Sequence, residues 1–183
     1  MKLLGISGSL RRESYNSLLL ENVRELLADD VELEVFDGLK DVPPFDEDDE
    51  ADPAPAVTYL RDAIAGADAV LFATPEYNAS IPGQLKNAVD WCSRPVATAA
   101  LRNKPVAVVG ASTGMFGAVW AQAELRKVLA TAGARVLEGE LPIPLAASQF
   151  DEAGRLTSEE LRGALAAVAE RLLAETATLA VAA

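Results

Sequence analysis

Two patterns of hydrophobic and polar residues alternate along this chain, short apolar runs and apolar residues at helical spacing. Short, mostly apolar runs are typical of buried strands in a parallel sheet, and they lie at residues 2–6, 69–73 and 105–109 and from residue 135. Residues 31–36 alternate apolar with acidic side chains, which predicts a half-buried strand at a sheet edge. Apolar residues at three- and four-residue spacing predict the helices, at residues 14–28, 55–65, 82–91 and about 117–131 and after residue 157.

The alternation of strands and helices predicts an α/β fold in one domain of residues 1–183. Five strands and five helices suit a flavodoxin-like three-layer sandwich, with a parallel sheet of order 2-1-3-4-5 and helices on both faces. Residues 37–56 are rich in proline and acid and predict a solvated surface loop, and Pro142 to Arg155 predicts a second loop. Thr157 and Glu160 have the spacing of a capping box that opens the terminal helix.

Charge and composition exclude several classes of function. With 16 basic and 28 acidic residues the net charge is −12, which disfavours nucleic acid and anionic membranes as partners. No apolar run approaches the length needed to cross a bilayer. The chain has one cysteine, Cys92, which suits a reducing compartment and predicts a cytoplasmic protein. It has no histidine, so a Ser-His-Asp site, a His-ligated metal and a His base are all excluded.

The loop after the first predicted strand has the composition of a phosphate site. Its candidate side chains are Ser9, Arg11, Ser14, Asn16 and Ser17. Small residues let backbone N–H groups turn toward a ligand, a helix start adds partial positive charge, and arginine is a forked donor for phosphate oxygens. A plain helix cap with exposed arginines is the alternative. Because the loop follows a strand's carboxyl end, where α/β sheets bind ligands, we favour the phosphate site.

The loop after the third predicted strand begins Pro75-Glu76-Tyr77-Asn78 and leads through Pro82 into a helix. Glu76 and Tyr77 have the chemistry of an acid/base pair. The alternative gives Glu76 a structural hydrogen-bonding role and makes Tyr77 a wall of a binding cleft. We favour the second interpretation, because the sequence offers no electrophile for an acid/base pair.

The loop after the fourth predicted strand contains the motif Gly110-Ala111-Ser112-Thr113-Gly114, which matches the nucleophile elbow of α/β-hydrolases. The elbow serine needs a histidine to accept its proton, and the chain has none, so we interpret the match as accidental. Glycines at 110, 114 and 117 suggest instead a backbone that closely approaches a flat group such as a ring system.

Over nearly its whole length the chain resembles the NADPH-dependent FMN reductases of flavodoxin-like fold, which include quinone, azo-dye and chromate reductases. The resemblance is carried by Gly8-Ser9-Leu10-Arg11 with Ser14, Asn16 and Ser17, and by Pro75-Glu76-Tyr77-Asn78 continuing to Trp91. It implies that Ser9, Arg11, Asn16 and Ser17 hold the FMN phosphate and that Pro75 to Asn78 line the isoalloxazine ring. Ser112, Thr113, Gly114 and Gly117 would close the other edge of the ring. The family usually has a second glycine where this chain has Ala118.

The resemblance implies an enzyme that needs no catalytic side chain and no metal. Hydride would pass from NADPH or NADH through bound FMN to a quinone-like, azo, metal-oxyanion or flavin acceptor, so that the flavin carries the chemistry. It also implies a homodimer or homotetramer, with Trp120 as candidate interface surface. Two alternatives are a flavodoxin-type electron carrier and a non-catalytic FMN-binding module. The arginine of the first loop and the Pro75–Asn78 segment favour the reductase.

Overall fold

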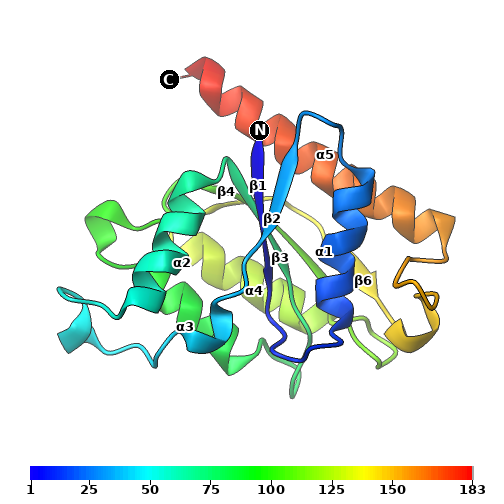
Figure 1. Ribbon diagram of the computed structural model, residues 1–183, viewed down its shortest axis with the longest axis horizontal. Helices are drawn as coiled ribbons and strands as arrows, with labels where there is room; N and C mark the ends of the chain where they lie inside the picture. Colours follow the sequence, from blue (N-terminus) through cyan, green and yellow to red (C-terminus); the bar gives the residue numbers. More distant parts are fainter. Residues whose placement is uncertain (183) are drawn as a thin grey trace.

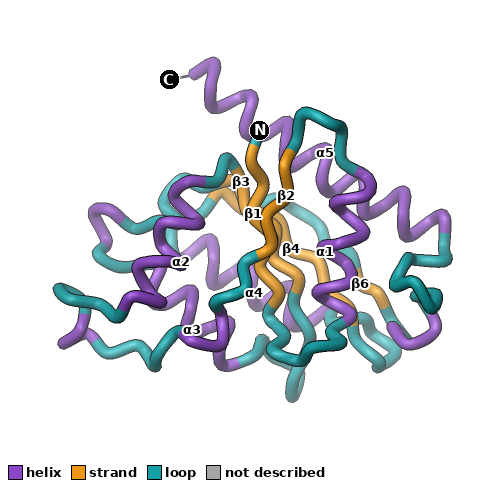
Figure 2. Tube along the Cα trace, in the orientation of Figure 1, coloured by secondary structure: helices purple, strands orange, loops and turns teal. Residues whose placement is uncertain are grey.

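In the computed structural model, one parallel sheet lies between two layers of helices (Figures 1 and 2). The structure describes residues 1–182, with the side chains of residues 1–176. The strands are β1 (Lys2–Ser7), β2 (Glu32–Val35), β3 (Ala69–Ala73), β4 (Pro105–Ala111), β5 (Arg135–Val136) and β6 (Pro142–Ile143). They pair in the order β2-β1-β3-β4-β5, and every pair is parallel. The predicted sheet order and the edge position of β2 are confirmed.

The fifth strand differs from the prediction because it is interrupted. β5 pairs with the start of β4, whereas Pro142–Ile143, which we expected in a loop, pairs with its end at Gly110 and Ala111. Between the two pieces lies Gly139, whose φ is +108°. β4 is seven residues long and leaves room for both pieces on its outer edge. A two-residue strand that contains a proline has no periodic pattern, so the sequence did not reveal it.

The helices cover the two faces of the sheet unequally. Their bounds are α1 (Tyr15–Leu26), α2 (Pro55–Gly66), α3 (Gly83–Cys92), α4 (Val119–Thr131) and α5 (Glu159–Ala182). Helices α2, α3 and α4 form one apolar core with the residues of β1, β3 and β4 that point to their side, and α1 and α5 form the second core on the opposite face. Successive residues of one strand therefore enter different cores, as Leu3 and Leu4 do. No helix in the described part of the chain has both the length and the apolarity needed to cross a membrane.

The predicted capping box at the start of α5 is wrong. Thr157 turns away from the helix, with its N–H donating to Gln149 O at 2.9 Å and its hydroxyl to the same oxygen at 3.2 Å. Ser158 takes the capping role, because its Oγ accepts from the backbone N–H of Leu161 at 3.3 Å. The helix therefore begins one residue later than the box would place it, because Thr157 is held by the preceding loop.

The proline-rich segment of residues 37–54 is tied to α3 along its inner side. The side-chain amide of Gln84 donates to Leu39 O and Val42 O, each at 2.8 Å, and the Trp91 indole donates to Pro43 O at 2.9 Å. Leu39 and Val42 are buried. The prediction of a solvated loop holds for the outward-facing residues, which include the exposed acidic stretch 46–49 and Asp37, Asp41 and Asp52, but not for this inner side.

Candidate functional site

Three loops leave the sheet side by side, at the carboxyl ends of β1, β3 and β4. The three strands end level, because Ser7 pairs with Ala73 and Ala73 with Val109. Two backbone bonds continue this alignment into the loops, Gly8 N–H to Ala73 O at 2.8 Å and Thr74 N–H to Val109 O at 2.9 Å. In Figure 1 these strand ends lie at the bottom of the sheet. The three loops singled out in the sequence therefore meet at one edge.

In the first loop the Arg11 guanidinium is held at the start of α1. It lies 5.3 Å from the centre of the Tyr15 ring, and its Nη2 donates to Glu13 O. The Ser9 hydroxyl accepts from the backbone N–H of Arg11 at 3.4 Å, and the Ser17 hydroxyl donates to Ser7 Oγ at 3.0 Å. These contacts gather one guanidinium and three hydroxyls at the amino end of a helix. This donor set suits a phosphate.

Ser14 and Asn16, also predicted phosphate ligands, are engaged inside the protein. Ser14 is the N-cap of α1, and its Oγ accepts from the N–H groups of Asn16 and Ser17 at 3.2 and 3.4 Å. Asn16 is buried, and its side chain bonds the backbone of Ala111 twice, Nδ2 to the carbonyl oxygen at 3.0 Å and the N–H to Oδ1 at 2.9 Å. Asn16 thus links the first loop to the third.

The middle loop makes a tight turn at Tyr77–Ser80. Tyr77 and Ser80 exchange both backbone hydrogen bonds, at 3.0 and 3.1 Å, and the two central residues, Asn78 and Ala79, have φ of +54° and +59°. Two successive positive φ angles define a type I′ turn, which suits asparagine at the first central position and glycine at the second. Pro75 is buried at the base of the loop, whereas the Tyr77 side chain is 52% exposed. The turn thus projects Tyr77 from the sheet edge.

Glu76 binds the amino end of α4. Its Oε2 accepts from the backbone N–H groups of Trp120 and Ala121 at 3.0 and 3.1 Å. The residue before the helix, Ala118, has φ of +61° and provides no side-chain cap. A carboxylate 44 residues before Trp120 in the chain therefore satisfies two of the helix's free N–H groups and complements its dipole. This geometry is the structural role that we favoured for Glu76 over an acid/base role.

In the third loop Ser112 is fixed by three hydrogen bonds. Its N–H donates to Ile143 O at 3.1 Å, its carbonyl accepts from Ala146 N–H at 3.0 Å, and its Oγ accepts from Gly114 N–H at 3.1 Å. The Ser112 hydroxyl thus stabilises the turn through Thr113, which lies exposed between the two.

The three glycines of this loop differ in what surrounds them. A Cβ at Gly110 would lie 2.8 Å from Thr74 O, and one at Gly117, whose φ is +58°, would lie 2.6 Å from Ile143 N. Both glycines therefore allow close packing within the protein. At Gly114 an added Cβ would meet nothing closer than Ser112 Oγ at 3.5 Å. Only this glycine leaves its backbone open to a ligand.

The sequence analysis missed Gln122, which is fully buried in α4. Its Nε2 donates to Gly117 O at 3.1 Å, and its Oε1 accepts from Leu141 N–H at 2.9 Å. It connects the glycine loop to the segment that leads into β6. The signal was a glutamine at position 122, where the spacing to Leu125 and Leu129 predicts an apolar residue.

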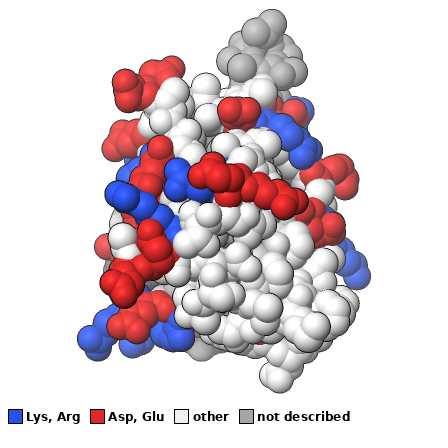
Figure 3. Space-filling view, turned by 90° about the vertical axis from the view of Figure 1, so that its right-hand side faces the viewer, with Lys and Arg blue, Asp and Glu red and all other residues white. Residues whose placement is uncertain are grey.

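Large apolar side chains surround the site. Phe116 is 59% exposed, Trp120 is 48% exposed, and their ring centres lie 4.8 Å apart. Met115 is exposed in the same loop as Phe116, and Leu145 is exposed in the segment that follows β6. Figure 3 shows a broad area without charges on the lower part of its face, at the end of the molecule where Figure 1 places the strands' carboxyl ends. An uncharged, partly aromatic surface of this kind suits flat organic molecules or another protein chain.

Comparison with known proteins agrees with this geometry. The family model described as NADPH-dependent FMN reductase matches residues 1–148. The chain is 44% identical over 164 residues to an NAD(P)H-dependent FMN reductase of Pseudomonas aeruginosa, covering 88% of each chain. It is 36% identical over 163 residues to the 2-hydroxy-1,4-benzoquinone reductase of a Burkholderia species, again covering 88% of each.

A solved structure, the flavoenzyme NAD(P)H:(acceptor) oxidoreductase FerB from Paracoccus denitrificans, superposes with a TM-score of 0.85 at 32% identity and covers 97% of both chains. This confirms the flavodoxin-like fold. The predicted enzyme class, an NAD(P)H-dependent flavin oxidoreductase with FMN and a nicotinamide nucleotide as cofactors, is confirmed as well. The chain belongs to the NADPH-dependent FMN reductase family.

Proposed function

We propose that residues 1–183 form one FMN-binding reductase domain, which passes hydride from NADPH or NADH to a small electrophilic acceptor. The observation that carries the proposal is the meeting of three loops at one sheet edge. One loop offers phosphate donors, the second projects Tyr77, and the third presents an open backbone at Gly114. The proposed FMN ligands are those predicted from the sequence, except that Ser14, Asn16, Glu76 and Gly117 support the loops rather than face the cofactor.

The donors and walls fit FMN. Arg11 with Ser9 and Ser17 would bind the phosphate, since a guanidinium and hydroxyls complement a dianion. Tyr77 and Asn78 would lie against one part of the ring, and Ser112 to Gly114 would lie against the other edge. The flat approach that a ring requires is possible at Gly114, where no side chain intervenes.

When bound, FMN supplies the hydride-accepting and hydride-donating chemistry, which no side chain of this protein can replace. The protein's own residues bind the cofactor, orient it and enclose it. Arg11 is preorganised by Glu13 and Tyr15, so little side-chain entropy is lost when it binds phosphate. Glu76 fixes the middle loop against α4, which sets the position of Tyr77.

The acceptors we propose are quinone-like, azo, metal-oxyanion or flavin compounds. Relatives are named as quinone reductases of Pseudomonas putida and Escherichia coli. The exposed rings of Phe116 and Trp120 support an aromatic acceptor, because stacking on a flat ring buries apolar area without leaving a polar group unpaired.

We further propose that a second copy of the chain covers part of this apolar rim, giving a homodimer or homotetramer. Exposed apolar side chains of this size are usually covered in a working assembly. We place the enzyme in the cytoplasm, where nicotinamide nucleotides are available as reductants and where a single buried thiol stays reduced.

Steady-state consumption of NADPH and NADH with menadione tests the function. FMN-loaded protein should turn over well above an equal concentration of free FMN. Turnover no faster than free FMN, together with retained flavin, would instead indicate the non-catalytic binding module. A slow reaction with nicotinamide but fast one-electron exchange with a protein partner would indicate the electron carrier.

A further inference from the structure

The Tyr15 ring, at the first position of α1, contacts two groups that come from different parts of the chain. The Phe150 ring stacks on it, with ring centres 5.6 Å apart and planes inclined by 19°. The Arg11 guanidinium lies 5.3 Å from the centre of the same Tyr15 ring. Both rings are half-buried and pack against the core beneath α1 and α5. The Tyr15 ring therefore connects the proposed phosphate donor to the segment that precedes α5.

The segment that carries Phe150 is a tight turn closed by its own hydrogen bonds. The N–H of Asp151 donates to Arg155 O at 2.9 Å. The Asp151 carboxylate accepts at Oδ1 from the N–H groups of Ala153 and Arg155, at 2.9 and 2.8 Å. Phe150 and Leu156 then pair as an antiparallel bridge. The backbone that carries the Phe150 ring is thus fixed at the base of the turn.

Asn22 anchors this turn to α1, the helix that also carries Tyr15. Asn22 is buried, and its Nδ2 donates to Gly154 O at 2.8 Å while its Oδ1 accepts from the N–H of Leu156 at 2.9 Å. A Cβ on Gly154 would lie 2.9 Å from a side-chain carbon of α1, so the turn packs directly on the helix. Because one helix both holds the turn and carries Tyr15, the Phe150 ring keeps a fixed place against the Tyr15 ring.

This stacking bears on Arg11, because the attraction between a cation and a ring depends on which way the ring faces. Among the described residues, only Glu13 O and the Tyr15 ring hold the Arg11 guanidinium, and Arg11 is exposed. A tyrosine ring without a neighbour turns about its side-chain torsions, whereas a stacked ring is confined to one plane. A cation held by such a ring loses less conformational freedom when it binds an anion.

We propose that Phe150 is a positioning residue for the FMN phosphate and acts on Arg11 through Tyr15. The inference rests on the proposed function in one respect, namely that Arg11 binds this phosphate. Phe150 itself would contact Tyr15 and not the cofactor. Loss of the Phe150 ring should therefore weaken binding of the phosphate and leave binding of the flavin ring unchanged. A purely structural role in the core would not separate the two.

The test compares FMN with riboflavin, which has the same ring system and lacks the phosphate. Each flavin is titrated with the full chain freed of flavin, and quenching of flavin fluorescence gives the two dissociation constants. Phe150→Leu keeps an apolar side chain in the core but removes the flat ring. It should lower the preference for FMN over riboflavin about two- to fivefold, as expected for the loss of an exposed cation–π contact.

The variant Phe150→Tyr retains the stacked ring and should retain the wild-type preference for FMN. An unchanged preference in Phe150→Leu would overturn the proposal. An equal loss of affinity for both flavins would also overturn it, because Phe150 would then support the fold and not the phosphate site.

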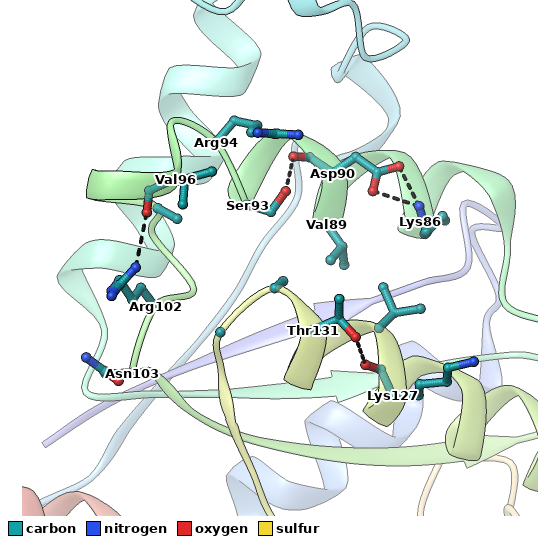
Figure 4. Close-up of a pocket in the computed structure, with 14 residues that line it drawn as sticks. Lys86, Val89, Asp90, Ser93, Arg94, Val96, Arg102, Asn103, Lys127 and Thr131 are labelled. Atoms are coloured by element: carbon teal, nitrogen blue, oxygen red, sulfur yellow. Dashed lines mark hydrogen bonds and ion pairs between the residues drawn. The ribbon is translucent and has the colours of Figure 1, made fainter.

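Two control variants separate this effect from general changes in packing and charge. Phe45→Leu removes a half-buried ring from the core on the opposite face of the sheet, where Phe45 packs on Trp91. Lys127→Ala removes one exposed positive charge at the groove between α3 and α4, whose charged side chains end on separate sides (Figure 4). Both should change the preference for FMN by less than about 1.5-fold, because distant sites act independently and exposed charges are screened. A change as large as that of Phe150→Leu would overturn the proposal.

A double-mutant cycle with Arg11→Ala tests the path through the guanidinium. Arg11→Ala should itself lower the preference for FMN, and Phe150→Leu added to it should cause no further loss, because no cation remains over Tyr15. A further loss equal to that in the wild-type background would overturn the proposal. If Arg11→Ala leaves the preference unchanged, the proposed phosphate site is wrong and this proposal fails with it. A clear effect of Arg11→Ala with none of Phe150→Leu would overturn this proposal alone.

Discussion

Asn16 and Ala111 form a reciprocal pair of hydrogen bonds, 3.0 Å from Nδ2 to the Ala111 carbonyl and 2.9 Å from the Ala111 N–H to Oδ1. The side-chain amide thereby completes the end of β4 as a neighbouring strand would. Because the pair is buried, its loss leaves a donor and an acceptor without partners.

Asn16→Ala should therefore lower the free energy of unfolding by about 2–4 kcal/mol, the cost of two unsatisfied buried backbone groups. Urea unfolding followed by circular dichroism measures this. Gln149→Ala is the control, since its side chain makes no hydrogen bond within the described residues, and it should change stability by less than about 0.5 kcal/mol. If Asn16→Ala loses no more stability than the control, water must replace the hydrogen bonds of Asn16 to Ala111.

Glu76→Ala should destabilise the protein by about 1–2 kcal/mol, because the first turn of α4 loses its only side-chain cap. Glu76→Gln should cost less, about 0.5–1 kcal/mol, since an amide oxygen still accepts while the interaction with the helix dipole is lost. Glu124→Ala, exposed on the same helix, is the control. The expected loss of stability is largest for Glu76→Ala, smaller for Glu76→Gln and smallest for Glu124→Ala. Equal losses for the two Glu76 variants would assign the whole effect to the negative charge.

Ala79→Gly should raise the free energy of unfolding by about 0.5–1 kcal/mol. Ala79 is exposed with φ of +59°, a conformation that costs a non-glycine residue about 1–2 kcal/mol. Glycine removes this cost in the folded state, but its larger conformational entropy in the unfolded chain cancels part of the stabilisation.

Ala118→Gly is the informative comparison, because it tests the same backbone strain at a buried position. The φ of Ala118 is +61°, and its methyl group is buried. The methyl group is closely packed, since a Cβ built on Gly110 would lie only 3.0 Å from it. Removing a buried methyl costs about 0.8 kcal/mol, so Ala118→Gly should stabilise less than Ala79→Gly. A larger gain at 118 would show that backbone strain outweighs packing in this loop.

Arg11→Ala should weaken FMN binding about 10- to 150-fold, the equivalent of 1.5–3 kcal/mol for hydrogen bonds to a charged group. Quenching of FMN fluorescence on titration with apoprotein measures it. The neighbouring Arg12→Ala should change the affinity less than threefold, since among the described residues no hydrogen bond, ion pair or ring contact holds the Arg12 side chain toward the loop. Equal effects at the two positions would indicate a general charge effect rather than a phosphate ligand.

Cys92 should make stability fall at alkaline pH. Burial raises the pKa of its thiol from an ordinary value of 9.0 to about 12. Between these values the unfolded chain releases the proton and the folded chain keeps it, so the free energy of unfolding drops by at most about 1.4 kcal/mol per pH unit as pH rises. Below pH 9 the thiol contributes no slope.

Comparison of the wild-type protein with Cys92→Ala over pH 8 to 11 isolates the thiol from other groups. The difference in stability should be constant up to about pH 9 and then move in favour of the variant. Parallel curves over the whole range would mean that the thiol ionises equally in both states.

Local pattern was sufficient for much of the fold. The apolar run at Ala69–Ala73 and the proline at 55 gave β3 and the start of α2 as observed, because burial on both faces and a missing N–H leave direct marks in the sequence. The start of α5 and the split fifth strand were not predictable, because both depend on hydrogen bonds that the local pattern does not show, to Gln149 eight residues earlier in one case and to β4 in the other.

The same division applies to the site. The sequence alone determined which residue types lie at the strand ends, and its lack of histidine excluded the hydrolase chemistry that the Ser112 motif suggests. Only the tertiary structure decided which of those side chains are engaged elsewhere. Asn16 and Glu76 contact Ala111 and Trp120, which are 95 and 44 residues away along the chain. A side chain's hydrogen-bond partner is set by what the fold brings within 3 Å, and no local pattern carries that information.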